Sequence, residues 1–327
     1  MSKPKIGFYW CASCGGCDEA VVDLAENILS VVEAVDIAVW PVAMDFKRSD
    51  VENMQDGEMV VTFINGAIRN TEDREIVEIL REKSKYIVAF GSCAHLGGVP
   101  GMGNLYTRES ILECSYSETP SVVNPEKVCP QGETTVPEGV LTLPVLEERV
   151  WTLDQTIEVD YYLPGCPPPV ALIVDGVTAF LTNQLPPKGS VLGPKHSLCL
   201  DCPRKDTKPE NMLIKEFKRP HETEIDLETC LLAQGLLCLG PATRSGCGAA
   251  CINGNMPCTG CLGPTDSVRD YGAKALSGIA SLFDAETEAD IARIADRIVD
   301  PAGTFYRYSL PGSLFQGKVF QKEGARS

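Results

Sequence analysis

The stretch "KIGFYWCASCGGCDEA", residues 5–20, joins a strand-like run to three cysteines and a pair of glycines. Residues 5–10 are mostly apolar and aromatic, which is typical of a buried parallel strand. The thiols of Cys11, Cys14 and Cys17 follow at once. In a parallel sheet the carboxyl ends of the strands lie at one edge, where doubly wound folds bind their ligands. The stretch therefore predicts a ligand site at the end of a first strand.

Further strand-like runs follow at residues 35–40, 59–64, 86–90 and 157–163. Amphipathic helices are expected at residues 18–34 and 71–84, and another helix is expected after the proline triplet that ends at residue 169. This alternation predicts an α/β fold, a flavodoxin-like doubly wound parallel sheet, over residues 1–186. A long proline-bearing insertion, residues 123–150, precedes the fifth strand.

The second half of the chain has a different character. The strand pattern fades from residue 187, and eight cysteines lie between Cys199 and Cys261. A segment this poor in regular structure needs cross-links to stabilise its fold, and bound metal supplies them. We therefore predict a second, irregular, cysteine-rich domain over residues 187–327, with helices near 266–283 and 286–299. The aromatic tail that follows is expected to pack on this chain or on a partner.

Composition narrows the class of protein. The 327 residues include 45 acidic and 29 basic side chains, a net charge of −16, which disfavours nucleic acid and anionic lipid as partners. No leader pattern opens the chain, and no apolar run reaches the roughly 18 residues of a membrane span. We expect a cytoplasmic protein. In that compartment the 15 cysteines point to metal rather than to disulfides.

Cysteines follow three of the predicted strands. Besides the first group, Cys93 lies in "GSCAHLGG", residues 91–98, and Cys166 lies in "PGCPPP", residues 164–169. Four thiolates gathered at one sheet edge would bind either a tetrahedral zinc ion or an iron–sulfur cluster. The glycines at 15 and 16 favour a cluster, because they let backbone N–H groups approach an anionic centre. The plain alternative is a set of small buried thiols.

The ordered set of motifs carries a family resemblance. The C-x-x-C after the first strand, "GSCAHLGG", "PGCPP", "CPRK", "CLGP" and "PCTGC" occur in the order found in the small subunit of [NiFe] hydrogenases, and the match covers about residues 5–265. The chain most resembles the cytoplasmic F420-non-reducing (methyl-viologen-reducing) group, whose electrons go to heterodisulfide reductase. The resemblance implies three [4Fe–4S] clusters.

Carried over residue by residue, the resemblance implies three ligand sets. The proximal cluster falls on Cys14, Cys17, Cys93 and Cys166, the medial cluster on Cys247, Cys251, Cys258 and Cys261, and the distal cluster on Cys199, Cys202, Cys230 and Cys238. Spacing alone would also allow Cys11 to pair with Cys14. Cys199 stands where periplasmic members have a histidine ligand, and Cys251 fills a corner that some members lack. Cys11, Cys114 and Cys129 are left as bystanders.

The resemblance also implies a role and partners. The nickel–iron centre belongs to a separate large subunit, and this chain has no catalytic residue of its own. It would pass electrons from the large subunit through the proximal, medial and distal clusters to a small iron–sulfur adaptor and heterodisulfide reductase. One alternative is the small subunit of an F420-reducing or NAD(P)-linked [NiFe] hydrogenase. An alternative of another class is a zinc-stapled structural or interaction protein.

Overall fold

The predicted strands form one parallel sheet in the computed structural model, which describes residues 3–317. The strands are β1 (Lys5–Trp10), β2 (Asp36–Val39), β3 (Met59–Asn65), β5 (Ser84–Phe90) and β9 (Tyr161–Leu163). Their order is β2-β1-β3-β5-β9, with every neighbouring pair parallel. The order changes direction between β1 and β3, as in flavodoxin-like sheets. The predicted fold class is confirmed.

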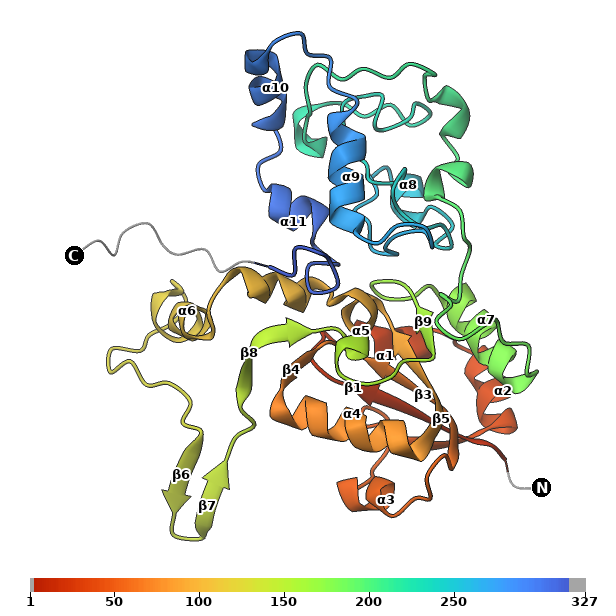
Figure 1. Ribbon diagram of the computed structural model, residues 1–327, viewed down its shortest axis with the longest axis vertical. Coiled ribbons are helices and arrows are strands. Elements are labelled where there is room, and N and C mark those ends of the chain that lie inside the picture. Colours follow the sequence, from red (N-terminus) through yellow and green to blue (C-terminus); the bar gives the residue numbers. More distant parts are fainter. Residues whose placement is uncertain (1–2, 318–327) are drawn as a thin grey trace.

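Each face of the sheet packs against its own helices (Figure 1). Along β3, Phe63 belongs to one hydrophobic cluster and Ile64 to the other, because successive side chains of a strand point to opposite faces. The Phe63 face packs against α1 (Gly16–Val22), α2 (Asn27–Ala34) and α7 (Val170–Leu181). The opposite face packs against α3 (Arg48–Glu52) and α4 (Thr71–Lys83).

Two predicted elements differ from the structure. The helix expected at residues 18–34 is broken between α1 and α2, where Ala25 adopts a left-handed backbone with φ of 49°. The fifth strand begins only at Tyr161. Directly before it, the Asp160 carboxylate accepts a hydrogen bond of 2.8 Å from the Ile87 N–H, so a side chain takes the place of a strand carbonyl there.

The segment between β5 and β9 contains regular structure that the sequence pattern did not predict. It contains α5 (Ser92–Leu96), η1 (Val99–Leu105), α6 (Arg108–Glu113), η2 (Cys114–Glu118), β6 (Glu133–Val136), β7 (Gly139–Thr142), β8 (Leu146–Trp151) and η3 (Leu153–Gln155). Strands β6 and β7 form an antiparallel hairpin that projects away from the sheet (Figure 1). Strand β8 returns to the body and pairs antiparallel with β4 (Ile68–Asn70).

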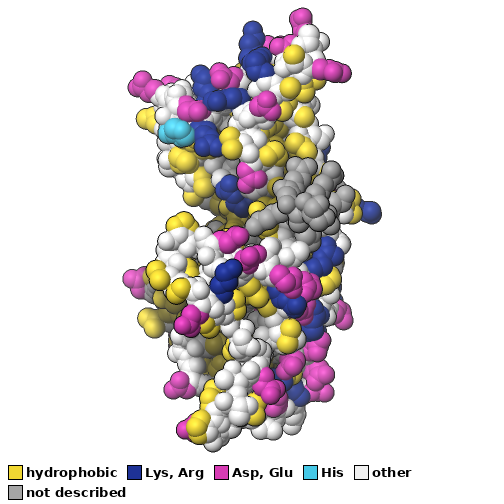
Figure 2. All heavy atoms as spheres, turned by 90° about the vertical axis from the view of Figure 1, so that its left-hand side faces the viewer, with side chains coloured by type: hydrophobic (Ala, Val, Ile, Leu, Met, Phe, Trp, Pro, Cys, Tyr) yellow, Lys and Arg dark blue, Asp and Glu magenta, His cyan; other side chains and the backbone are white. Residues whose placement is uncertain are grey.

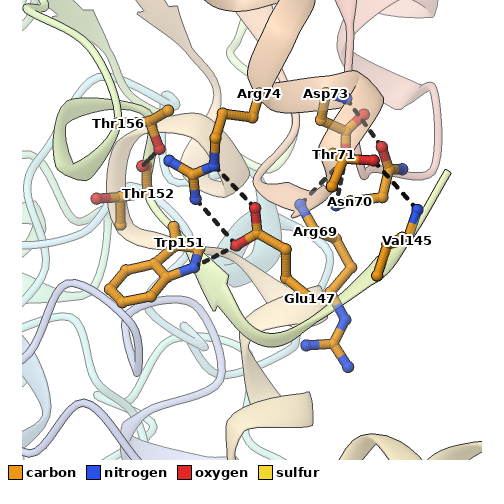
Figure 3. Close-up of polar contacts among 10 residues, drawn as sticks. All are labelled: Arg69, Asn70, Thr71, Asp73, Arg74, Val145, Glu147, Trp151, Thr152 and Thr156. Carbon is orange, nitrogen blue, oxygen red and sulfur yellow. Dashed lines mark hydrogen bonds and ion pairs between the residues drawn. The ribbon is translucent and has the colours of Figure 1, made fainter.

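A polar network fixes β8 to the start of α4 (Figure 3). The Arg74 guanidinium donates two hydrogen bonds, of 2.8 and 2.9 Å, to the two carboxylate oxygens of Glu147. The Trp151 indole N–H donates to the same carboxylate at 2.6 Å. Beside them the Asn70 side chain caps α4 by accepting the Asp73 N–H. The network attaches the insertion to the sheet through ionic as well as strand contacts.

The second half forms a separate lobe with little regular structure (Figure 1). Its elements are η4 (Leu198–Leu200), η5 (Lys205–Thr207), η6 (Pro220–Glu222), α8 (Ala250–Asn253), α9 (Tyr271–Ala280), α10 (Glu288–Ala295) and α11 (Pro301–Phe305). Helices α9 and α10 fall within the two predicted helical ranges but are shorter. Their inner faces share one hydrophobic cluster with five of the cysteines proposed as ligands, Cys202, Cys230, Cys238, Cys247 and Cys258. The boundary at residues 186/187 stays a prediction.

The tail returns to the sheet lobe. The N–H of Gly98 donates to the Tyr308 carbonyl at 3.1 Å, and the N–H of Gly312 donates to the Leu96 carbonyl at 3.2 Å. The Gln155 side chain donates to the Pro311 carbonyl at 2.9 Å. Up to residue 317 the tail therefore docks on this chain, and Lys318 at the end of the predicted aromatic segment lies outside the described residues.

The surface agrees with the acidic composition. Figure 2 shows the two lobes meeting at a narrower waist, with acidic side chains spread over the lower lobe. Among residues 3–317, no helix is both long and apolar enough to cross a membrane.

Candidate metal centres

The four thiols proposed as proximal ligands meet at the carboxyl edge of the sheet. Cys14 and Cys17 follow β1, Cys93 lies in α5 directly after β5, and Cys166 follows β9. Burial raises the pKa of the Cys17 thiol, and the neighbouring thiols of Cys93, Cys166 and Cys14 raise it further. The pKa of Cys93 is raised to about 12 by burial and by the thiols of Cys166 and Cys14. An electron-rich group of four is therefore present, which a cation-containing centre would stabilise.

Two glycines leave the space in which these sulfurs lie. A Cβ placed on Gly91, whose φ is 86°, would stand 2.4 Å from the Cys17 Sγ. A Cβ on Gly98, whose φ is 59°, would stand 2.3 Å from the Cys93 Sγ. Both positions need backbone that L-residues rarely adopt, and both need the side chain to be absent. The bare backbone thus forms a cradle for the thiols, which fits an iron–sulfur cluster.

Cys11 lies on the other face of the sheet. Its thiol is buried in the cluster that contains Val39, Met59 and Ile64, whereas Cys17 belongs to the cluster of Phe63. Burial raises the pKa of Cys11 well above its ordinary value. This placement supports Cys14 and Cys17 as the first two proximal ligands.

The four thiols proposed as distal ligands line one cavity. Cys199, Cys202, Cys230 and Cys238 share it with Arg204 and Lys208. Burial raises the pKa of Cys199 to about 11, neighbouring thiols add to the rise, and the Lys208 ammonium opposes it. The Arg204 N–H donates to the Cys202 Sγ at 3.4 Å. The donor set and the hydrogen bond to sulfur fit a thiolate-bound cluster.

The four thiols proposed as medial ligands also lie close enough to influence one another's pKa. Burial raises the pKa of Cys261 to about 11, with Cys247 and Cys251 contributing. Burial raises the pKa of Cys258 to about 12, while hydrogen bonds from the Gly260 N–H and from Thr243 lower it. Cys251 is exposed, unlike Cys258. The chain thus brings all four proposed medial thiols into one neighbourhood.

The three sets follow one another through the molecule. Cys261 of the medial set lies beside Cys166 of the proximal set, whose N–H donates to the Cys261 sulfur. At the other end the Cys258 N–H donates to the Cys238 Sγ, a distal thiol, at 3.4 Å. The Ser92 hydroxyl next to Cys93 also donates to the Cys261 carbonyl at 2.5 Å. The order is therefore proximal, medial, distal, starting at the sheet edge.

Three further residues near the cysteine motifs can now be placed. His196 lies outside the distal cavity and pairs with the Asp201 carboxylate at 2.8 Å. His95 stacks on the Tyr162 ring, with centroids 4.6 Å apart, and burial lowers its pKa to about 3. Arg204, which the sequence places in a basic surface cluster, is buried. Sequence reasoning also missed the hydroxyls of Ser92 and Thr243, for which no motif gives a signal.

No group of three or more His, Cys, Asp or Glu side chains within residues 3–317 is placed to hold a single metal ion. Ligands of one zinc ion converge on a point about 2.3 Å from each sulfur. Cluster ligands stand further apart, because each thiolate binds a different iron.

Comparison with known proteins agrees with this geometry. The sequence model of the family described as "NADH ubiquinone oxidoreductase, 20 Kd subunit" matches residues 14–180. The iron–sulfur subunit of the F420-non-reducing hydrogenase of Archaeoglobus profundus is 41% identical over 97% of this chain and 99% of its own. The corresponding subunit of the F420-non-reducing hydrogenase of Methanothermobacter thermautotrophicus is 39% identical over 98% of this chain and 99% of its own.

A solved structure shows the same fold at lower identity. The [NiFeSe] hydrogenase of Desulfovibrio vulgaris Hildenborough, in the oxidized state, aligns over 87% of this chain and 99% of its own, with a TM-score of 0.52 and 17% identity. Fold and sequence together define a small subunit of the nickel–iron hydrogenase class. Within that class, the chain belongs to the family of F420-non-reducing hydrogenase iron–sulfur subunits, and the expected resemblance is confirmed.

Proposed function

We propose that this chain is the electron-transfer subunit of a cytoplasmic [NiFe] hydrogenase and binds three [4Fe–4S] clusters. Cys14, Cys17, Cys93 and Cys166 would hold the proximal cluster. Cys247, Cys251, Cys258 and Cys261 would hold the medial one, and Cys199, Cys202, Cys230 and Cys238 the distal one. The clusters supply one-electron redox chemistry when bound. The observation that carries the proposal is the contact of the three thiol sets in sequence, through Cys166–Cys261 and Cys238–Cys258.

The chain's own residues hold and tune the clusters. Backbone N–H groups and the Thr243 hydroxyl donate to thiol sulfurs of the medial and distal sets. Such hydrogen bonds stabilise negative charge on sulfur and so raise a cluster's reduction potential. Burial excludes water from Cys17, Cys93 and Cys258. Potentials and solvent access are the properties that an electron carrier must control.

The partners follow from the same proposal. Hydrogen would be oxidised on a separate large subunit that meets the proximal cluster. The distal cluster would deliver electrons to a small iron–sulfur adaptor and then to heterodisulfide reductase. Affinity capture from native extract identifies the acceptor, because an F420-binding or NAD(P)-binding subunit in place of the adaptor would redirect the assignment.

Ligand substitution tests the cluster proposal. In the assembled complex, Cys17→Ser or Cys166→Ser should abolish hydrogen-dependent dye reduction and remove the proximal cluster's electron paramagnetic resonance (EPR) signal. The matched controls Cys11→Ser and Cys114→Ser should keep both. Iron and zinc are measured in every sample. Zinc without iron would refute the cluster assignment in favour of a zinc-stapled protein, and loss of the signal in Cys11→Ser but not in Cys17→Ser would refute the proximal ligand set.

A further inference from the structure

Arg204 is a buried cation that forms no ion pair with a carboxylate of residues 3–317. Its side chain and backbone together are only 5% exposed. The guanidinium donates to the carbonyls of Asp226, Thr229 and Ile252 at 3.0, 3.3 and 3.4 Å, and to the Asn255 side-chain oxygen at 2.8 Å. Every one of these acceptors is neutral. Its hydrogen bonds are satisfied, but its charge is not balanced by them.

A second buried arginine in the same lobe has its charge balanced by a carboxylate, as is usual for buried charges. Arg244 is 1% exposed and forms an ion pair of 2.6 Å with the Asp266 carboxylate. Within residues 3–317, no carboxylate forms such a pair with Arg204. Its charge does contribute to lowering the pKa of the exposed Asp226, after the hydrogen bonds from Thr229 and Glu228. A buried charge without an ion pair is costly, so a negative group on its other side would stabilise Arg204.

The distal cluster proposed for the cavity beside Arg204 would supply such a negative group. The same cavity is lined by the four proposed distal thiols and by Lys208, whose ammonium already lowers the pKa of Cys199. Four thiolates outweigh the positive charge of a [4Fe–4S] core in both redox states, and reduction adds one more negative charge. A cation fixed beside the cluster therefore stabilises the reduced state more than the oxidised one.

The buried charge next to the proximal set has the opposite sign. Asp18 is 2% exposed and follows Cys17 directly. Its carboxylate accepts hydrogen bonds from the Trp40 indole at 2.9 Å and from the Asn65 amide at 2.7 Å. Because this buried carboxylate lies one residue from Cys17, it disfavours further negative charge on the proximal sulfurs.

We propose that Arg204, assisted by Lys208, is the counter-charge of the distal cluster and raises its reduction potential, while Asp18 lowers that of the proximal cluster. The inference rests on the distal and proximal ligand sets proposed above. The two fixed charges place the reduction potential of the distal cluster above that of the proximal cluster. Electrons entering at the sheet edge are thereby drawn outward to the acceptor.

The test is an EPR-monitored redox titration of each cluster in the purified, assembled complex. In Arg204→Gln, the ratio of reduced to oxidised distal cluster at a fixed potential should fall about tenfold, which is about 59 mV for one electron. The medial and proximal midpoints should stay within error. Arg204→Lys should recover most of the wild-type value. Arg293→Gln, which removes a positive charge from the exposed face of α10, should leave all three midpoints unchanged.

Further variants test the two charges separately and define the results that would overturn the inference. Asp18→Asn should shift the proximal midpoint upward and leave the distal one unchanged. If Arg204→Gln does not retain the distal cluster, the midpoint of Lys208→Gln decides, because Lys208 is exposed and lines the same cavity. An unchanged distal midpoint in the decisive variant, or an equal shift in Arg293→Gln, overturns the inference. A wild-type complex with no distal signal would instead refute the distal ligand set, and the inference with it.

Discussion

Replacing Gly91 with alanine should prevent binding of the proposed proximal cluster while leaving the fold intact. Gly91 joins β5 to α5, with φ of 86° and ψ of 166°, a conformation that is almost restricted to glycine. The added Cβ would lie 2.4 Å from the Cys17 Sγ, well inside the 3.4 Å at which ordinary contact begins. The sulfur would therefore have to move by about 1 Å.

This displacement can be compared with what a metal ligand tolerates. Ligand distances in protein metal sites hold to within about 0.2 Å, several times less than the movement required. The backbone conformation itself costs about 1–3 kcal/mol for an alanine, which a domain of this size survives. Cluster binding should therefore fail before the sheet does.

The assay compares Gly91→Ala with Gly189→Ala in the purified complex. Gly189 has a similar φ of 84°, but nothing lies within 4 Å of the Cβ that an alanine would add. Both variants carry backbone strain, and only one meets a thiol. We expect Gly91→Ala to lose about a third of the iron bound by this chain together with the proximal EPR signal, and Gly189→Ala to keep both. Full iron content and an unaltered proximal signal in Gly91→Ala would refute the reasoning.

Two further predictions concern the insertion and the medial set. Hydrogen bonds from Arg74 lower the pKa of Glu147 in the folded protein. The ion pair therefore stabilises the attachment of β8 fully at pH values above the ordinary carboxyl pKa of about 4.3. This stabilisation is lost as the pH falls through the lowered pKa of the folded protein. Glu147→Gln should therefore reduce the free energy of opening of the β8 amides by about 1–3 kcal/mol at pH 7, as measured by hydrogen exchange. If the difference between the variant and the wild type persisted well below pH ~4, the ionic origin would be contradicted. Cys251→Ala should convert the medial cluster to a three-iron form, detected by EPR of the oxidised complex with the other signals retained, whereas an unchanged four-iron medial cluster would exclude Cys251 as a ligand.

The sheet could be predicted because its strands are buried on both faces. Such strands are continuous apolar runs, as "MVVTFI" is over residues 59–64. Each can be identified from its own residues, without knowledge of the strand that pairs with it. The break at Ala25 could not be predicted, since neither glycine nor proline marks the left-handed residue. The β6–β7 hairpin had a signal in Pro137 and Glu138, followed by Gly139, at the turn between two short β-prone runs. The prolines around it favoured the interpretation as an irregular insertion.

The candidate site could likewise be predicted only in part. Cysteines at strand ends could be grouped because a parallel sheet brings its carboxyl ends together. The burial of Arg204 could not be predicted, because "CPRK" reads equally well as an exposed basic loop. Its position depends on carbonyls from residues 226, 229 and 252, which only the folded chain brings to one place.

The return of the tail to the sheet lobe also constrains the order of events during synthesis. The loop of Gly97 and Gly98 behind Cys93 is covered by residues 308–312, and a Cβ on Gly97 would stand 2.2 Å from a Pro311 ring carbon. A ribosome releases these covering residues more than 200 positions after Cys93. The emerging sheet can fold earlier, since N-terminal units generally form first. The thiols proposed as proximal ligands nevertheless stay uncovered on that side until residues 308–312 have been synthesised, so the covering segment closes this approach to them only after the sheet has formed.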